Sequence, residues 1–190
     1  MRRLLATVVA LAALAALAGC GLPSGSLHQV DPAKVPPGLV KANSSSAPSV
    51  VGPPARVYFV AGARLVPEVR RVVGLNVPSE SLRALLLGPT PAESAAGVAS
   101  EIPPQTRLIS LDLRGKVALV DLGSDFGSAG GSQQVLAVAQ IVYTLTASRV
   151  ITAVEFSIDG RRIEVPDGSG SLSTAPRTRG DYRDQAPQRP

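Results

Sequence analysis

The chain has very few of the side chains on which enzyme and metal sites depend. Its 190 residues include one cysteine, one histidine and no tryptophan, and aromatic residues make up 3%. A disulfide needs a second cysteine, and a catalytic thiol or hydroxyl needs a base such as histidine in the same fold. The histidine, His28, lies instead in a Pro- and Ser-rich stretch. We therefore expect no metal site, no cofactor and no enzymatic activity, and the length excludes large catalytic architectures such as a full α/β barrel.

An excess of charge of one sign is missing from the part of the chain that can fold. The whole chain carries 19 Lys and Arg against 14 Asp and Glu, but residues 55–170 carry 11 of each sign. Nucleic-acid binding depends on clustered basic side chains and, for single strands, on stacking aromatic rings. Since the positive charge lies in the flanking segments, we expect no nucleic-acid partner.

The first twenty residues have the pattern of a secretory signal. Arg2 and Arg3 precede an apolar run over residues 4–17, which would span roughly 21 Å as a helix, short of the roughly 30 Å hydrocarbon core of a bilayer. The sequence Leu17-Ala18-Gly19-Cys20 then resembles the lipobox of bacterial lipoproteins. This resemblance implies cleavage after Gly19, a thioether-linked lipid on Cys20 and acylation of the new amino terminus, for example by palmitate. We expect residues 1–19 to be a signal peptide and Cys20 to anchor an extracytoplasmic protein to the cell membrane.

Segments of biased composition flank the part expected to fold. Residues 20–54 are rich in Pro, Ser, Gly and Ala without sustained periodicity, which predicts the lipidated cysteine followed by a disordered linker. Residues 169–190 are polar and include Arg179-Gly180-Asp181, a tripeptide that chance explains better than an adhesion signal. Such a composition cannot bury enough apolar area to order itself. We therefore expect a disordered tail and place the folded domain at residues 55–168.

Apolar runs separated by glycine turns predict two β-hairpins in the first two thirds of this domain. The first joins strands at 56–60 and 65–69. The second joins residues 108–113 to 116–122 through Arg114-Gly115, and its strands are apolar on both faces. Strands with two apolar faces are typical of the centre of a sheet, so we expect both of these to be central.

A third hairpin has the clearest turn signal. Residues 154–158 and 161–165 flank Asp159-Gly160, a dipeptide typical of two-residue turns. The turn fixes the register, so Phe156 should pair with Ile163 and Val154 with Val165 on a buried face.

Two segments have helical periodicity. Residues 78–87 have helix start signals, apolar positions three and four residues apart, and a stop at Gly88-Pro89. Residues 133–146 follow a helical period over a longer stretch. Together with the strands, they predict an α+β fold: a single small domain with a mixed or antiparallel sheet and two helices packed on one face.

The segment from Gly88 to Thr106 is too proline-dense for a regular helix or strand, so we expect an irregular ordered loop. Long ordered loops often carry function. We take this loop as the candidate interaction site, with these residues as its candidate contacts: Gly88, Pro89, Thr90, Glu93, Gly97, Ile102 and Pro103.

Several motifs within residues 55–168 resemble one known family. They are Val57-Tyr58-Phe59, Leu82 to Thr90 (LRALLLGPT), Gly97, Ser100-Glu101-Ile102-Pro103, Gln140 to Thr146 (QIVYTLT) and Phe156 to Gly160 (FSIDG). This set is similar to the GerMN domain, the sporulation and spore-germination module. The resemblance implies a small α+β domain on envelope lipoproteins, with no known enzymatic activity and no catalytic residues, similar to ring-building modules of secretion-like assemblies.

We expect the domain to act through contacts with an envelope protein, in assembly or in envelope signalling. A receptor for a small ligand or a cell-wall fragment, with the loop of residues 88–106 as its pocket wall, is the alternative. A hydrolase could use carboxylates such as Asp121 and Asp125, or the pair Glu155 and Glu164. We favour protein contacts, because nothing in the domain supplies a nucleophile paired with a base.

Overall fold

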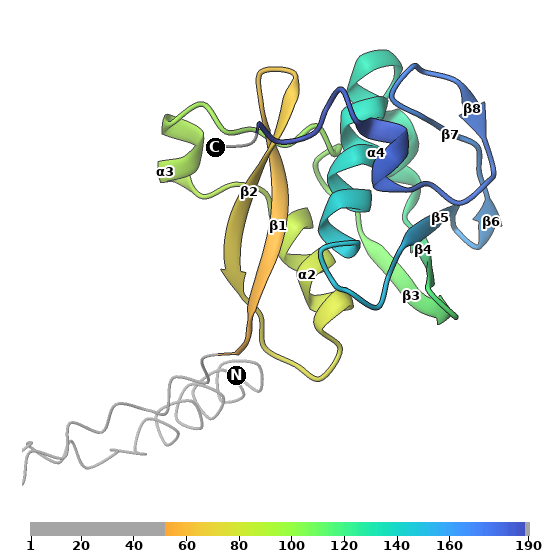
Figure 1. Ribbon diagram of the computed structural model, residues 1–190, viewed down its shortest axis with the longest axis horizontal. Helices are drawn as coiled ribbons and strands as arrows, with labels where there is room; N and C mark the ends of the chain where they lie inside the picture. The colour runs from red at the N-terminus through yellow and green to blue at the C-terminus, as the bar shows by residue number, and fades with distance from the viewer. Residues whose placement is uncertain (1–51, 189–190) are drawn as a thin grey trace, which may run out of the picture. The chain divides into compact units, whose positions relative to one another are not determined.

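The computed structural model describes residues 52–188 (Figure 1), so the expected signal peptide, Cys20 and most of the expected linker lie outside the described residues. The described part is a small α+β domain with antiparallel and mixed sheets, and this confirms the predicted fold class. No helix within residues 52–188 has the length and apolar character needed to cross a bilayer.

The first predicted hairpin is present. Strands β1 (Pro54–Ala61) and β2 (Arg64–Arg71) pair in antiparallel register around a turn in which Gly62 has a φ of 62°. Four consecutive residues of β1, Val57 to Val60, are buried, so both faces of the strand are covered. In contrast, β2 alternates between half-buried and exposed positions after Leu65, as an edge strand does.

Both predicted helices are also present. Helix α2 (Val77–Leu86) begins after Asn76, whose side chain accepts a hydrogen bond from the Ser79 backbone. Helix α4 (Gly131–Leu145) is buried along its whole C-terminal half, from Ala137 to Leu145. The two helices contact each other and β1, and they lie between the hairpin and the second sheet (Figure 1).

The second sheet has four strands in the order β3–β4–β5–β6. They are β3 (Leu108–Arg114), β4 (Val117–Leu122), β5 (Ala153–Ile158) and β6 (Arg161–Arg162). Strands β4 and β5 are parallel, because the chain crosses over through α4 and the short 3₁₀ helix η3 (Ser124–Ser128) between them. The prediction that 108–113 is a central strand is wrong: β3 is an edge strand, and its apolar residues are only half covered.

The third hairpin is shorter than predicted. Its Asp159-Gly160 turn is correct, with positive φ at both residues, and Ser157 pairs with Arg162. The Ile163 backbone N–H still donates to the Phe156 carbonyl, but Val154 does not pair with Val165. Val154 instead exchanges two backbone hydrogen bonds with Arg177, at 2.9 and 2.8 Å, so a segment from the C-terminal part occupies this position.

The prediction of a disordered tail from residue 169 is wrong. After β6 the chain forms β7 (Val165–Pro166), β8 (Leu172–Ser173) and the 3₁₀ helix η4 (Arg179–Tyr182). Tyr182 is fully buried and Arg177 is 7% exposed. The Tyr182 ring and the apolar part of the Arg177 side chain bury surface that the polar composition of this segment did not indicate. The folded domain therefore extends to residue 188.

One hydrophobic core joins these elements. It includes side chains from the hairpin, both helices, the four-stranded sheet and η4. Phe126 of η3 and Phe156 of β5 stack in this core with ring centroids 6.2 Å apart. Because the C-terminal segment contributes Tyr182 to the same cluster, it is part of the domain.

Candidate functional site

The first half of the predicted interaction loop is a helix with its own cap. Helix α3 (Pro91–Ala95) begins at Thr90, whose hydroxyl accepts a hydrogen bond from the Glu93 backbone while the Glu93 carboxylate accepts one from the Thr90 backbone. This is a capping box. The expectation of an irregular segment is therefore wrong here, because the Thr-Pro-Ala-Glu sequence satisfies the backbone groups that begin a helix.

Glu93 also fixes α3 to the hairpin. Its two carboxylate oxygens accept hydrogen bonds of 2.7 and 2.5 Å from the Arg70 guanidinium on β2. The bonds from Arg70 lower the pKa of Glu93 from its ordinary value of 4.5 to about 2. Arg70 in turn lies over the Phe59 ring, 5.2 Å from its centroid. The loop is thus attached by a charged pair and not free to move independently of β2.

The second half of the loop follows the edge of β1. Ala99 exchanges two backbone hydrogen bonds with Val60, at 2.9 and 2.8 Å. Ile102 is buried in the core, and the Pro103 carbonyl accepts hydrogen bonds from the backbone and the hydroxyl of Thr106. These residues hold the loop in place.

The remaining candidate residues lie at the ends of the short helices. Gly88 and Gly97 have φ values of 81° and 83° after α2 and α3, a conformation that favours glycine. Pro89 is half-buried, whereas Thr90 and Gly97 are exposed. The role of this loop in an interaction stays a prediction.

Two polar residues of α4 close the outer edge of β1. The Tyr58 backbone N–H donates to the Thr144 hydroxyl at 3.0 Å, and the Gln140 amide donates to the Tyr58 carbonyl at 3.2 Å. The Gln140 amide oxygen accepts from the Glu101 backbone at 2.8 Å. Both side chains are buried, and their burial is explained by these bonds. Gln140 and Thr144 belong to the QIVYTLT motif, so this part of the motif serves strand closure.

Arg179 of the C-terminal segment contacts the same motif. Its guanidinium lies over the rings of Tyr143 and Tyr58, at 4.6 and 5.3 Å from their centroids. It also donates to the Thr146 hydroxyl at 2.7 Å and to the Tyr143 carbonyl at 2.8 Å. Burial raises the pKa of Tyr143 above its ordinary value. No pattern in the sequence indicates this contact, and the Arg179-Gly180-Asp181 tripeptide is part of the packed structure.

Tyr182 and Arg177 fix the rest of this segment. The Tyr182 hydroxyl donates to the Pro166 carbonyl at 2.6 Å, and burial raises the pKa of Tyr182 far above its ordinary value. The Arg177 guanidinium donates to the carbonyls of Val165 and Ser171. The segment therefore closes over α4 from strand β5 to the hairpin, where the Gln185 carbonyl accepts a bond from Leu65.

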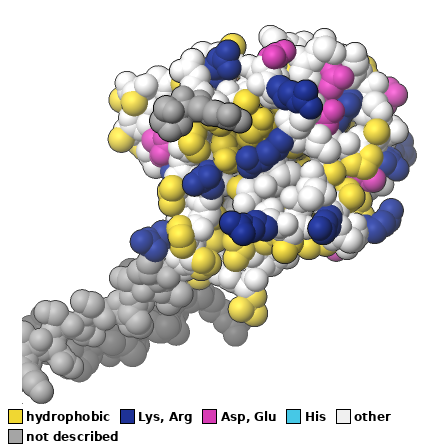
Figure 2. Space-filling model, viewed as in Figure 1, with side chains coloured by type: hydrophobic (Ala, Val, Ile, Leu, Met, Phe, Trp, Pro, Cys, Tyr) yellow, Lys and Arg dark blue, Asp and Glu magenta, His cyan; other side chains and the backbone are white. Residues whose placement is uncertain are grey.

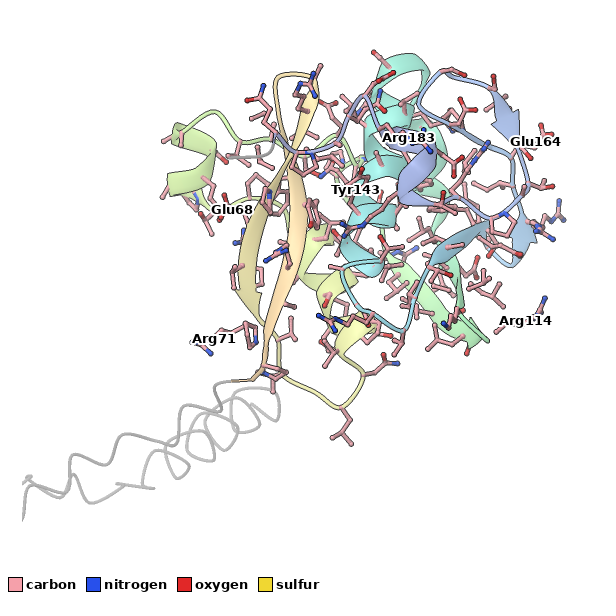
Figure 3. The ribbon with its side chains drawn as sticks, in the orientation of Figure 1. Glu68, Arg71, Arg114, Tyr143, Glu164 and Arg183 are labelled. Carbon is pink, nitrogen blue, oxygen red and sulfur yellow. The ribbon has the colours of Figure 1, made fainter. Side chains whose placement is uncertain are left out.

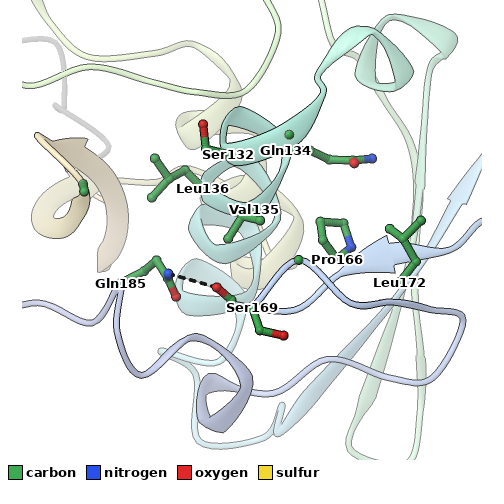
Figure 4. Close-up of a pocket in the computed structure, with 12 residues that line it drawn as sticks. Ser132, Gln134, Val135, Leu136, Pro166, Ser169, Leu172 and Gln185 are labelled. Carbon is green, nitrogen blue, oxygen red and sulfur yellow. Dashed lines mark hydrogen bonds between the residues drawn. The ribbon is translucent and has the colours of Figure 1, made fainter.

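A cavity of about 510 Å³ lies between this segment, the N-terminal turn of α4 and the hairpin turn (Figure 4). Uncharged polar and aliphatic side chains line it, among them Ser132, Gln134, Leu136, Ser169 and Leu172. None of its lining residues comes from the loop of residues 88–106. That loop contributes Thr106 to a separate hollow of about 580 Å³ beside α2.

Asp121 and Glu155, two of the four carboxylates considered for a hydrolase, make structural contacts. The two oxygens of Asp121 accept hydrogen bonds from the Gly160 backbone at 3.0 and 3.1 Å, which holds the β5–β6 turn. Glu155 forms an ion pair of 3.0 Å with Arg162. Within residues 52–188, no group of three His, Cys, Asp or Glu side chains could hold a metal ion.

The outer edge of β3 is left open in the part of the chain that the structure describes. All seven residues of β3 lie at the border of the four-stranded sheet, and no strand within residues 52–188 pairs with the far side. Ile109 and Leu113 are 51% and 50% exposed there. A bulge lies between Leu108 and Ser110. An exposed edge of this kind can add a strand from another chain.

Comparison with known proteins identifies the fold. Among solved structures, the tandem GerMN domains of the sporulation protein GerM from Bacillus subtilis superpose with a TM-score of 0.55 at 20% identity, covering 68% of this chain and 47% of that chain. The first GerMN domain of the same protein gives a TM-score of 0.54 at 20% identity and covers 67% of this chain and 98% of that chain. This chain thus spans about half the length of the tandem structure.

The sequence match ends before the C-terminal segment. The family described as sporulation and spore germination, Germane, matches residues 56–164, whereas Arg177, Arg179 and Tyr182 lie beyond them. No curated protein matches the chain. The matched range is more than half of the chain, and it agrees with the GerMN resemblance of its motifs and with the fold. The chain therefore belongs to the sporulation and spore germination family, and its folded part contains a GerMN domain.

Proposed function

We propose that this protein is a lipoprotein of the cell envelope, anchored at the outer face of the membrane by lipid on Cys20. Its GerMN domain works by binding another envelope protein, in assembly or in envelope signalling, and not by catalysis. The apolar segment of residues 4–17 followed by Leu17-Ala18-Gly19-Cys20 supports the anchor. The membership in the sporulation and spore germination family supports a role in the envelope.

The open edge of β3 is the observation that carries the protein-binding part of this proposal. The strand offers seven residues of backbone to a partner strand, and Ile109 and Leu113 supply apolar contacts beside it. Arg107, Asp112 and Arg114 are exposed next to them, and charged side chains on an edge discourage unspecific pairing. The edge is therefore suited to one selected partner strand.

The anchor is tested by Cys20→Ala. This substitution removes the sulfur that would carry the lipid, so the protein should stay unprocessed or leave the membrane fraction. Cell fractionation and the mass of the processed protein measure both effects. An unchanged membrane fraction with the processed mass would contradict lipidation at Cys20.

The partner edge is tested by a photoreactive residue at position 109 in the anchored protein. It should crosslink one envelope protein or a second copy of this chain. Leu113→Asp should prevent this crosslink from position 109, and Ile109→Asp should prevent the crosslink from a photoreactive residue at position 113. Leu172 on β8, 58% exposed, is the matched control position. Equal capture from positions 109 and 172 would contradict a role of the β3 edge.

A receptor for a small ligand is the second candidate, and the cavity of about 510 Å³ favours it. Its lining of serine and glutamine side chains with aliphatic groups suits a neutral ligand with hydroxyl or amide groups, such as a wall fragment. Binding would raise the melting temperature of the domain by mass action. A Ser132→Leu variant that abolishes this shift would support the receptor, and the absence of any shift at millimolar muropeptide would exclude these fragments.

A further inference from the structure

Four segments that are distant in the sequence meet where the chain enters the domain. We call this region the proximal end and define it as residues 53–56, 69–77, 114–116 and 147–152. Pro54 pairs directly with Arg71. A hollow of about 390 Å³ is lined jointly by the first, second and fourth segments. The Thr152 backbone N–H donates to the Lys116 carbonyl at 2.9 Å, which brings the β3–β4 turn to the same end.

The proximal end has an excess of positive charge, although the described residues as a whole carry nearly equal numbers of basic and acidic side chains. Residues 52–188 contain 14 basic and 13 acidic side chains; the proximal end holds six of the basic ones and none of the acidic ones. Arg70 is paired with Glu93, and the other five are exposed: Arg56, Arg71, Arg114, Lys116 and Arg149. Figure 2 shows Lys and Arg side chains spread across the lower half of this face, with little acidic surface among them.

Figure 3 shows where the labelled charged residues lie. Arg71 and Arg114 lie at the two lower corners of the domain, whereas Glu68, Glu164 and Arg183 lie farther from the lower end. The remainder of the described residues carries eight basic and thirteen acidic side chains. The domain therefore has a positive end and a more negative body.

Large apolar side chains are exposed at this same end. Val69, Val73, Leu75 and Val150 make up four of the eight large apolar residues found exposed in the part of the chain that the structure describes. Leu75, at the tip of the β2–α2 loop, is fully exposed at 106%. An exposed leucine at an end of the domain that also carries exposed arginines is unfavourable in water but suits the headgroup region of a bilayer.

We propose that the proximal end binds the surface of an anionic lipid bilayer, with Leu75 inserted among the headgroups and the five exposed cations beside the lipid phosphates. This inference rests on the proposed anchor, because Cys20 would hold the domain next to that surface. Thirty-one residues separate Cys20 from Gly52, so the proximal end is the part of the domain closest along the chain to the membrane. The apolar side chains favour a bilayer over an anionic wall polymer, which would offer them no apolar surface.

The experiment uses the lipidated full chain in vesicles of phosphatidylcholine with or without phosphatidylglycerol. Since the chain has no tryptophan, Leu75→Trp introduces a single fluorescent reporter. In anionic vesicles its emission should shift to shorter wavelength and be quenched by brominated lipid. Leu172→Trp, also exposed and on β8, is the matched reporter and should stay unquenched.

Charge is tested in the Leu75→Trp background. Arg71→Gln should lower the ratio of bound to free domain on the order of fivefold, the effect of one cation near an anionic surface. Arg161→Gln, an exposed arginine on β6 outside the proximal end, should change nothing. Added salt should weaken quenching in the first reporter only.

The outcomes separate this inference from the anchor on which it rests. If the chain does not float with the vesicles, the proposed lipid anchor fails. If it floats but the two reporters are quenched equally, or neither is quenched, or quenching is the same without phosphatidylglycerol, the proximal end does not bind anionic lipid and the inference is overturned. A Leu75 contact made by a protein instead would leave the reporter unquenched by brominated lipid.

Discussion

Tyr182 provides the strictest test of the packed C-terminal segment. Its ring is fully buried in the hydrophobic core, where η4 contacts α4, and its hydroxyl donates to the Pro166 carbonyl at 2.6 Å. Truncating a buried aromatic side chain to alanine costs about 3–5 kcal/mol, so Tyr182→Ala should remove much of the stability of a domain of this size. Tyr182→Phe keeps the ring and should cost about 1–3 kcal/mol, because the Pro166 carbonyl loses its partner.

The same residue predicts a loss of stability in alkali. Burial raises the pKa of Tyr182 in the folded state, whereas the unfolded state ionises near the ordinary value of 10.0. Above that pH the unfolded state binds fewer protons than the folded state, so unfolding becomes more favourable as pH rises, by up to about 1.4 kcal/mol per pH unit. Tyr182→Phe should remove this contribution, and the smaller one from Tyr143 should remain.

Urea denaturation of the mature chain carrying Cys20→Ser, followed by circular dichroism between pH 7 and 11, measures both effects. Hydrogen exchange of the amides in residues 177–185 reports independently on the order of the segment. If Tyr182→Ala changes the free energy of unfolding by less than about 0.5 kcal/mol, the typical value for an exposed site, the burial of Tyr182 is refuted.

Two further substitutions test the interior contacts by the same denaturation assay. Glu93→Gln should lower the free energy of unfolding by about 1 kcal/mol at pH 7, the scale of a partly exposed ion pair. This difference should be present above pH 4.5 and vanish towards pH 2, because Glu93 becomes protonated in the folded state as well. A difference that persists at pH 2 would argue against the pair with Arg70. Gln140→Leu should cost about 2–4 kcal/mol, since it leaves the Tyr58 carbonyl and the Glu101 N–H unpaired. Gln133→Leu removes only an exposed hydrogen bond of 3.2 Å to the Glu101 carbonyl and should cost about 0.5 kcal/mol or less. Equal losses in the two variants would contradict the strand closure.

Local patterns predicted the elements whose signals are local. The first hairpin and both long helices follow from periodicity, caps and glycine turns, and each was found within two residues of its expected range at both ends. The Asp159-Gly160 turn is likewise a property of two residues. Only the length of its hairpin was wrong, because Arg177, distant in the sequence, takes the pairing position beside Val154.

Contacts between distant segments explain the other errors. The polar composition of residues 169–190 indicated disorder. Tyr182 and Arg179 nevertheless pack against α4, and Arg177 pairs with β5, contacts that no local pattern discloses. In the loop after α2, the capping box of Thr90 and Glu93 was a readable signal, but the surrounding prolines obscured it. Proline at the first helical position is compatible with such a cap.

The candidate sites also depend on contacts between distant segments, which the sequence does not reveal. The motif residues Gln140 and Thr144 were recognised by resemblance, but only the structure explains why two polar side chains are buried in α4. The charge count by segment showed a balanced domain, because adding charges along a chain ignores which segments meet. The positive proximal end exists only in three dimensions.

The closure of β1 by two side chains of α4 has a consequence for how chains of this family can vary in length. Gln140 and Thr144 are four residues apart and so lie one above the other on the helix. A residue gained or lost between them would rotate one side chain about 100° away from the strand and leave a backbone group of Tyr58 without a partner. Insertions and deletions among relatives should therefore avoid this turn of α4 and collect in the loops at its two ends.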